Sequence, residues 1–183
     1  MGTKRLETAR LVLRPFTVED APAMYATWAA DPAVTRWMRW EPHRDVAETQ
    51  ALLQGWVQDY ADPLFYNWAV TLQDGTLIGA IGVVRGEQGE YWEPGYAFGQ
   101  AFWGRGYATE ALRAVADHLF AEQGLEVLHC CHAVENPASG VVQRHVGFHR
   151  THTGVYHKFD GTEILCQYCE LTKKEFYDRT RND

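Results

Sequence analysis

Apolar and polar residues alternate along several short stretches of the chain, and this period of two is typical of β-strands. The expected strands cover residues 10–16, 66–72, 77–84, 90–99, 127–134, 148–156 and 162–171. Asp74-Gly75 and Asp160-Gly161 each lie between two consecutive strands, and such pairs are strong signals for tight hairpins. A further turn is expected at residues 86–89, so most of the sheet should be antiparallel.

Between these strands, apolar residues recur at every third or fourth position, which predicts amphipathic helices. The expected helices cover residues 17–30, 45–60 and 138–145, and another follows Gly106. The apolar stripe of the helix after Gly106 consists of Ala108, Ala111, Leu112, Val115 and Leu119. The expected inner face of the helix at residues 45–60 consists of Ala47, Leu52, Leu53 and Trp56.

The helix after Gly106 also joins the strand at residues 90–99 to the strand at residues 127–134. Because a helical crossover links strands that run in the same direction, these two strands should be parallel. The chain is therefore predicted to have an α+β fold, with a mostly antiparallel mixed sheet and helices on both of its faces.

Composition and charge narrow the class of protein. The 183 residues are 46% hydrophobic, which suits a single domain over residues 1–183 whose core needs neither disulfides nor metal. The net charge of −7 provides no positive field for nucleic acid. No apolar run approaches the roughly 18 residues of a membrane span, and no signal peptide is recognisable. We therefore expect a cytoplasmic protein with neither nucleic acid nor a membrane as partner.

The four cysteines all fall in expected strands, as the adjacent pair Cys130-Cys131 and as Cys166 and Cys169. Neighbouring residues of a strand, and residues three apart, point to opposite faces, so neither pair can hold one ion without a bulge. We expect reduced cysteines in the core and no metal, with zinc binding or a disulfide as the alternative.

The most informative stretch of the chain runs from Gly95 to Ala111, where an apolar strand passes through two glycines directly into a helix. Gly104 and Gly106 allow backbone conformations that a Cβ disfavours, so successive N–H groups can converge on one anion. The first turn of the helix adds unpaired N–H groups and the positive end of the helix dipole. Together these features predict a binding site for a phosphate or diphosphate group.

Three sets of residues carry a resemblance to a known family. They are residues 6–15 (LETARLVLRP), residues 103–111 (WGRGYATEA), and Asn136-Pro137-Ala138-Ser139 followed by Gly147-Phe148. In this order they resemble the GNAT superfamily of acyl-CoA N-acyltransferases, and within it the RimJ/RimL branch of ribosomal-protein N-terminal acetyltransferases. The resemblance covers nearly the whole chain and implies a GNAT-like fold whose parallel strand pair is splayed.

The resemblance implies that acetyl-CoA is the co-substrate and that its acetyl group passes directly to a primary amine in a ternary complex. The amine would belong to a protein N-terminus or a small molecule, and the protein would be a monomer or a homodimer. Residues implied in coenzyme binding are Ala97, Phe98, Trp103, Gly104, Arg105, Gly106, Tyr107, Ala108, Thr109, Asn136 and Ser139. The amide of Asn136 would contact the pantetheine arm, although a helix cap is an equally good use of an Asn-Pro pair.

Two residues are candidates for the chemistry. Glu93 lies in the strand that leads to the glycine loop and is a candidate base for the amine, with a solvent-facing glutamate as the alternative. Ser139 would, by resemblance, hydrogen-bond the thioester sulfur and help to protonate it. Relatives often have a tyrosine acid four residues before the Gly-Phe glycine, and that position here is Gln143. Ala101 is a second departure, because the coenzyme loop often begins there with Gln or Arg.

For the acceptor side, the candidates are Trp37, Trp40, Trp92 and His157. The three tryptophans could line a pocket or belong to the core. His157 lies near a position where relatives of the RimL kind have an acidic residue, and a neutral imidazole could serve as a base there.

Two other functions fit parts of the sequence. A non-catalytic acyl-CoA-binding sensor would explain Ala101 and the missing tyrosine. A dinucleotide-binding oxidoreductase would explain Gly104-x-Gly106, but Thr109 stands in the place of the third glycine and several strands precede the loop.

Overall fold

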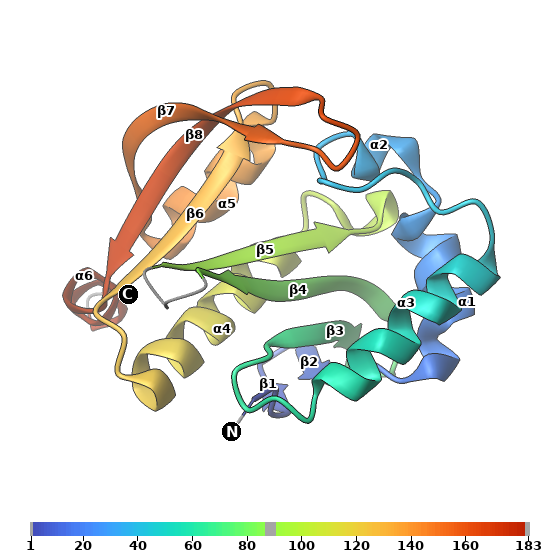
Figure 1. The fold of residues 1–183 in the computed structure, drawn as a ribbon. Coiled ribbons are helices and arrows are strands. Elements are labelled where there is room, and N and C mark those ends of the chain that lie inside the picture. Colours follow the sequence, from blue (N-terminus) through green and yellow to red (C-terminus); the bar gives the residue numbers. More distant parts are fainter. Residues whose placement is uncertain (1, 87–90, 182–183) are drawn as a thin grey trace.

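The computed structural model describes residues 2–86 and 91–181, and their eight strands form two sheets (Figure 1). The antiparallel first sheet has the order β1-β2-β3-β4-β5, and the second has the order β6-β8-β7. The strands of the first sheet are β1 (Leu6–Glu7), β2 (Leu11–Arg14), β3 (Asn67–Leu72), β4 (Leu77–Arg85) and β5 (Trp92–Phe98). Those of the second are β6 (Val127–Ala133), β7 (His149–His157) and β8 (Glu163–Thr172).

The helices lie between and after these strands. The α-helices are α1 (Ala21–Met24), α2 (Pro32–Thr35), α3 (Val46–Asp59), α4 (Tyr107–Gln123), α5 (Pro137–Val146) and α6 (Lys173–Thr180). Two 3₁₀ turns, η1 (Val18–Asp20) and η3 (Gln100–Phe102), and a π-helical turn, η2 (Tyr25–Ala29), complete the set. None of the helices in the described ranges is long and apolar enough to cross a membrane.

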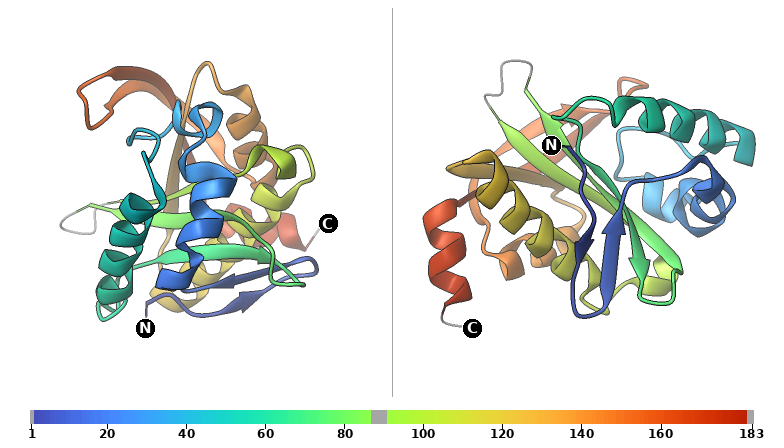
Figure 2. Two further views of the ribbon diagram at one scale, coloured as in Figure 1. Left: turned by 90° about the vertical axis from the view of Figure 1, so that its right-hand side faces the viewer. Right: turned by 90° about the horizontal axis from the view of Figure 1, so that it is seen from below.

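Helices cover both faces of the first sheet, as the two views of Figure 2 show. Helix α4 packs on one face, where Leu112, Val115 and Leu119 are completely buried against strand residues such as Trp68 and Ile81. Helices α1 and α3 pack on the other face, around Trp28 and Leu53. Each layer buries its apolar side chains against the sheet, which is the main favourable term for this arrangement.

The predicted α+β architecture is confirmed, including the seven strands and the inner stripe of α4. The strands expected to form one mixed sheet instead form two antiparallel sheets, because no ladder joins β5 to β6 among the described residues. The predicted inner face of α3 is partly wrong, because Ala47 and Leu52 are exposed. The helix turns Thr49 and Leu53 inward instead. The short elements β1, α2 and α6 were not predicted. The turn expected at residues 86–89 and the first residue of the strand expected at 90–99 lie largely outside the described residues.

Candidate active site

A cavity of about 670 Å³ lies where the end of β5, the glycine loop, the start of α4 and the first turns of α5 meet. Residues of α2 and of the segment after it, among them Trp37, close its other side. Ten of the eleven residues implied in coenzyme binding line this cavity: Ala97, Phe98, Trp103, Gly104, Gly106, Tyr107, Ala108, Thr109, Asn136 and Ser139. Arg105 does not line it.

The glycine loop has the backbone that its sequence predicts. Gly104 and Gly106 have φ angles of 71° and 80°, in the left-handed region that favours glycine. Gly106 is the N-cap of α4, and its carbonyl accepts the first helical hydrogen bond, from the N–H of Glu110. The N–H groups that precede Glu110 therefore have no partner within the helix. An anion in the cavity would meet these groups at the positive end of the helix dipole.

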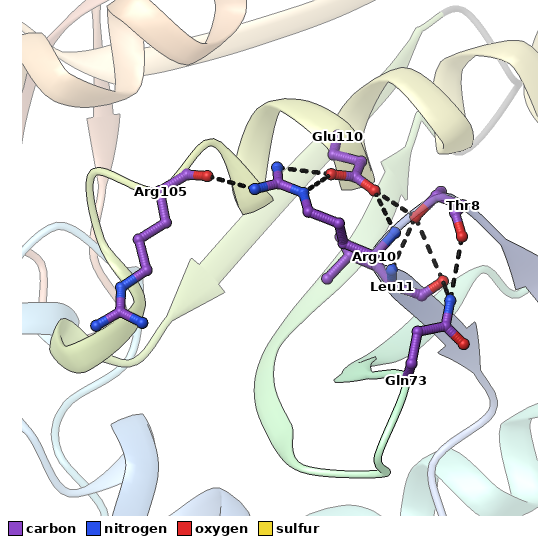
Figure 3. Close-up of polar contacts among 6 residues, drawn as sticks. All are labelled: Thr8, Arg10, Leu11, Gln73, Arg105 and Glu110. Atoms are coloured by element: carbon purple, nitrogen blue, oxygen red, sulfur yellow. Dashed lines mark hydrogen bonds and ion pairs between the residues drawn. The ribbon is translucent and has the colours of Figure 1, made fainter.

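A carboxylate in the same helix fastens the loop to the β1–β2 turn (Figure 3). One Glu110 oxygen accepts hydrogen bonds from the Thr8 hydroxyl at 2.6 Å and from the Arg10 N–H at 3.0 Å. The other oxygen accepts from Arg10 Nε at 2.7 Å and pairs with Arg10 Nη2 at 2.6 Å. We call this group, Thr8, Arg10 and Glu110, the clamp. It connects residues about a hundred positions apart in the sequence.

The Arg10 guanidinium extends the clamp to the loop itself. Its Nη1 donates to the Arg105 carbonyl at 2.9 Å, and its carbon lies 4.7 Å from the centre of the Tyr107 ring. The side chain of Arg105 points away from the clamp (Figure 3). Burial alone would raise the pKa of Glu110, but hydrogen bonds from Thr8 and Arg10 outweigh it and lower this pKa. The clamp thus fixes the carbonyl between the two glycines and neutralises a carboxylate near the helix N-terminus.

Strands β5 and β6 begin side by side and then diverge (Figure 1), and the cavity is lined by the end of β5 but by no residue of β6. Backbone hydrogen bonds pair β5 with β4, and β6 with β8. Pro94 has no N–H to offer β6, and its carbonyl accepts instead from the Cys130 thiol at 3.3 Å. A proline at this position thus favours separation of the two strands.

The divergence leaves backbone groups of β5 facing the cavity side. The N–H of Gly99 donates to the Ile78 carbonyl, so the backbone of Gly99 faces β4. Because backbone groups alternate in an antiparallel ladder, those of Tyr96 and Phe98 face the opposite side, toward β6. The Phe98 carbonyl accepts there from Trp103 Nε1 at 2.7 Å, and the N–H groups of Tyr96 and Phe98 point the same way. These N–H groups are positioned to meet an oxygen of a bound ligand.

The first turn of α5 brings Asn136 and Ser139 to the same cavity. Asn136 is the N-cap of α5, and its side-chain oxygen accepts from the Ser139 N–H at 3.4 Å. Asn136 also lines the cavity, so the same residue caps the helix and faces the site. The Ser139 hydroxyl lies 2.8 Å from the hydroxyl of Tyr96. Tyr96 also donates toward the Ser139 carbonyl at 3.2 Å. Tyr96 is not among the residues predicted from the sequence, because nothing in the local pattern shows which helix residue a strand tyrosine will meet.

Glu93 does not line the cavity. Its side chain lies on the face of β5 opposite to that of Tyr96, where its carboxylate accepts from the Cys131 thiol at 3.1 Å. A hydrogen bond with Cys166, burial and the charge of Glu93 all raise the pKa of Cys131. Cys131 therefore stays a protonated thiol and a poor nucleophile. All four cysteines are free, and Cys130 and Cys131 belong to different core clusters, as their alternation predicts.

The four residues expected on the acceptor side fall in different places. Trp37 lines the cavity and packs against the cluster of Ala133, Tyr156 and Cys166. Trp40 packs on the core of α1 and α3, and Trp92 is buried in the main core. His157 is exposed, 3.2 Å from Glu163. The structure thus brings only Trp37 of these four to the cavity.

Gln143, in the position of the missing tyrosine, is a buried structural residue. Its side-chain oxygen is 2.7 Å from His132 Nδ1, and its amide donates to the Cys131 carbonyl at 2.9 Å. Burial lowers the pKa of His132, which keeps the imidazole neutral. These bonds attach α5 to β6 and so fix the position of Ser139.

The clamp makes a prediction about stability. We expect Glu110→Gln to lower the free energy of unfolding at pH 7 by about 2 kcal/mol, because charge-assisted bonds to a half-buried carboxylate are lost. The pKa of Glu110 is lowered in the folded state, so its contribution is present above the unfolded pKa of about 4.3 and is lost as pH falls below it. The difference from wild type should therefore shrink between pH 5 and about pH 3.

Urea unfolding across this pH range provides the measurement. Glu126→Gln, the same change at an exposed glutamate, is the control and should leave stability nearly unchanged. Equal small losses in the two variants would contradict a stabilising clamp.

Comparison with known proteins identifies the family. The acetyltransferase (GNAT) domain matches residues 10–149. The uncharacterized N-acetyltransferase p20 of Bacillus licheniformis is 28% identical over 178 residues, covering 93% of this chain and 97% of p20. A GNAT-family acetyltransferase structure from Bacillus anthracis has a TM-score of 0.80 at 20% identity, covering 94% of this chain and 100% of that one.

A further similar structure is a spermidine N-acetyltransferase from Vibrio cholerae, solved in complex with CoA and spermine. Its TM-score is 0.76 at 18% identity, and the match covers 93% of this chain and 99% of that one. At this identity the structural likeness concerns the fold, whereas the domain match covers most of the sequence. The chain therefore belongs to the GNAT acetyltransferase family and is an N-acetyltransferase.

Proposed function

We propose that this acetyltransferase moves the acetyl group of acetyl-CoA directly to a primary amine within a ternary complex. The observation that carries the proposal is the cavity itself. The glycine loop, the start of α4, the freed edge of β5 and Ser139 all open into one space. Acetyl-CoA has a diphosphate, a thioester carbonyl and a sulfur atom within one extended molecule. The protein groups that bind these three parts must therefore line one continuous cavity.

The loop residues fit the diphosphate of CoA. Gly104 has open space where a Cβ would be, and a Cβ on Gly106 would meet Arg10 Nη2 of the clamp at 3.3 Å. Backbone N–H groups can therefore approach an anion closely, as they do in other glycine-rich phosphate sites. Arg105 would add positive charge from the edge of the loop, since it does not line the cavity.

Acetyl-CoA would supply an activated acetyl group as a thioester, and the protein would supply the remaining chemistry. The N–H groups of Tyr96 and Phe98 would donate to the thioester oxygen as negative charge develops on it. Ser139 would hydrogen-bond the sulfur from the opposite wall. Glu93 would take the amine proton, directly or through a water molecule, from the other face of β5. Direct transfer is favoured over an acyl-cysteine route because no cysteine lines the cavity.

For the acceptor, we propose an amine that passes Trp37 to reach the thioester. The acidic net charge suits a cationic amine, such as a polyamine or the N-terminus of a basic protein. The Vibrio cholerae structure named above is of a spermidine acetyltransferase, and the motifs at residues 6–15 and 103–111 resemble the RimJ/RimL branch. Polyamines and protein N-termini are therefore the two acceptor classes to test first.

Turnover separates an enzyme from a non-catalytic sensor of acyl-CoA. With acetyl-CoA and a panel that includes spermidine and peptides with a free N-terminal serine, we expect amine-dependent release of free CoA thiol. The readout is a thiol reagent, with mass spectrometry of the acetylated amine. Binding of acetyl-CoA without thiol release for any amine would support the sensor instead.

The loop conformation makes a prediction about coenzyme affinity. Gly106→Ala should raise the Kd for CoA roughly five- to thirtyfold, because alanine disfavours a φ of 80° by about 1–2 kcal/mol and would shift the N–H groups. Gly75→Ala is the matched control, since Gly75 has a φ of 88° in a hairpin turn that does not line the cavity. Calorimetry should show wild-type affinity for Gly75→Ala. Equal affinity in both variants would contradict this placement of the diphosphate.

The proposed role of Glu93 as a base predicts a lower kcat when its carboxylate is removed. Glu93→Gln should lower kcat by about 100-fold near pH 7, with little change in the Kd for CoA. Because a protein α-amine has a pKa near 8, raising the pH should restore part of the rate by deprotonating the amine in solution. Glu170→Gln removes a carboxylate on β8 that does not line the cavity, and it should keep the wild-type rate. A Glu93→Gln enzyme at full speed would remove Glu93 from the mechanism.

A further inference from the structure

Two hydroxyl groups meet inside the cavity from different elements. Tyr96 comes from β5 and Ser139 from the first turn of α5, and both line the cavity. Their oxygens are 2.8 Å apart, a normal distance for a hydrogen bond between hydroxyls. The Tyr96 hydroxyl is also 3.2 Å from the Ser139 carbonyl. No other part of the proposed mechanism uses the side chain of Tyr96.

We infer that Tyr96 is a positioning residue for the leaving group: its hydroxyl donates to Ser139 Oγ and so directs the Ser139 hydrogen toward the thioester sulfur. The inference rests on the proposed function and adds a residue to it. It concerns the transfer in which a bond forms between the amine nitrogen and the acetyl carbon while the bond between that carbon and the sulfur breaks. The sulfur takes the electron pair and leaves as the CoA thiolate, and the amine proton goes to Glu93.

The direction of the Ser139 hydrogen depends on which hydroxyl donates to the other, because each hydroxyl has one hydrogen. If Ser139 donates to Tyr96, its hydrogen is used, and the tyrosine hydrogen goes to the Ser139 carbonyl at the longer distance of 3.2 Å. If Tyr96 donates to Ser139 Oγ at 2.8 Å, the serine hydrogen is free to point into the cavity. Negative charge on a departing sulfur favours the second arrangement, because a donor then faces it.

The same contact makes Ser139 a better donor. A hydroxyl that accepts one hydrogen bond is polarised and donates a stronger one, particularly in a site of low dielectric. Tyr96 itself keeps its proton, because burial and the nearby Cys130 thiol raise the pKa of its phenol. The sulfur is therefore stabilised by a hydrogen bond, and neither O–H bond needs to break during the step.

The surroundings hold both partners in place. Tyr96 is fixed by the β4–β5 ladder, in which it lies opposite Ile81. Ser139 is fixed by the Asn136 cap and by the bonds of Gln143 to His132 and to the Cys131 carbonyl. Gln143 cannot donate a proton as an acid, but it fixes the helix that carries Ser139. The arrangement thus offers a phenol from β5 where relatives use one from the helix.

A double-mutant cycle tests the inference. Tyr96→Phe removes only the hydroxyl, and Ser139→Ala removes the partner. We expect each single variant to lower kcat about tenfold, the value of one hydrogen bond, with less than a twofold change in KM for acetyl-CoA. The double variant should be no slower than Ser139→Ala alone, because Tyr96 acts only through Ser139.

Tyr60→Phe is the control for a purely structural role. The Tyr60 hydroxyl accepts from the Phe16 N–H and donates to the Asn67 carbonyl, and Tyr60 does not line the cavity. This variant should lose stability in urea unfolding but keep the wild-type kcat. Ser139→Thr, which keeps a hydroxyl, should retain more of its rate than Ser139→Ala and should respond to Tyr96→Phe.

The outcomes that overturn the inference differ from those that overturn the function. A wild-type kcat in Tyr96→Phe, or a double variant whose losses multiply to about 100-fold, would show that Tyr96 does not act through Ser139. These results would leave the acetyltransferase intact. A wild-type protein that binds no CoA would instead refute the proposed function, and this inference with it.

Discussion

The separation of β5 from β6 is the constraint on which the candidate site depends. If the two strands stayed paired, the N–H groups of Tyr96 and Phe98 would be used in the sheet, and no cavity would open between β5 and α5. Pro94 removes one donor at the point where the strands still touch, and the Cys130 thiol takes up the carbonyl left there. The strands are then free to diverge, and the cavity lies beside the freed end of β5.

The clamp explains why a motif at the start of the chain accompanies a motif near its middle. Thr8 and Arg10 are far from the glycine loop in sequence, yet both bond to Glu110, and Arg10 also bonds to the Arg105 carbonyl. A loop with two left-handed glycines is flexible by nature, and its entropy must be lost before it can bind an anion well. The clamp lowers that cost by holding the loop in advance.

Much of the fold and part of the candidate site could be predicted from the sequence. Alternation and turn residues gave the strands, and the stripe from Ala108 to Leu119 gave the packing of α4, because local periodicity decides which face is buried. The inner face of α3 was harder, since its core contact is small and Thr49 is buried beside Leu53. Single tryptophans carry no such periodicity, so Trp37 could not be distinguished from Trp92. Contacts between distant elements, such as Tyr96 with Ser139, depend on how the helices dock on the sheets.

The central claim is that the backbone at residues 104–109 binds the diphosphate of CoA. The most direct test follows the backbone amide resonances of the labelled protein during titration with CoA, and separately with pantetheine, which lacks the diphosphate. The account predicts that the largest shifts with CoA fall at residues 104–109, and that pantetheine leaves these resonances nearly unchanged. Large CoA-induced shifts elsewhere, with the amides of this loop unmoved, would contradict it.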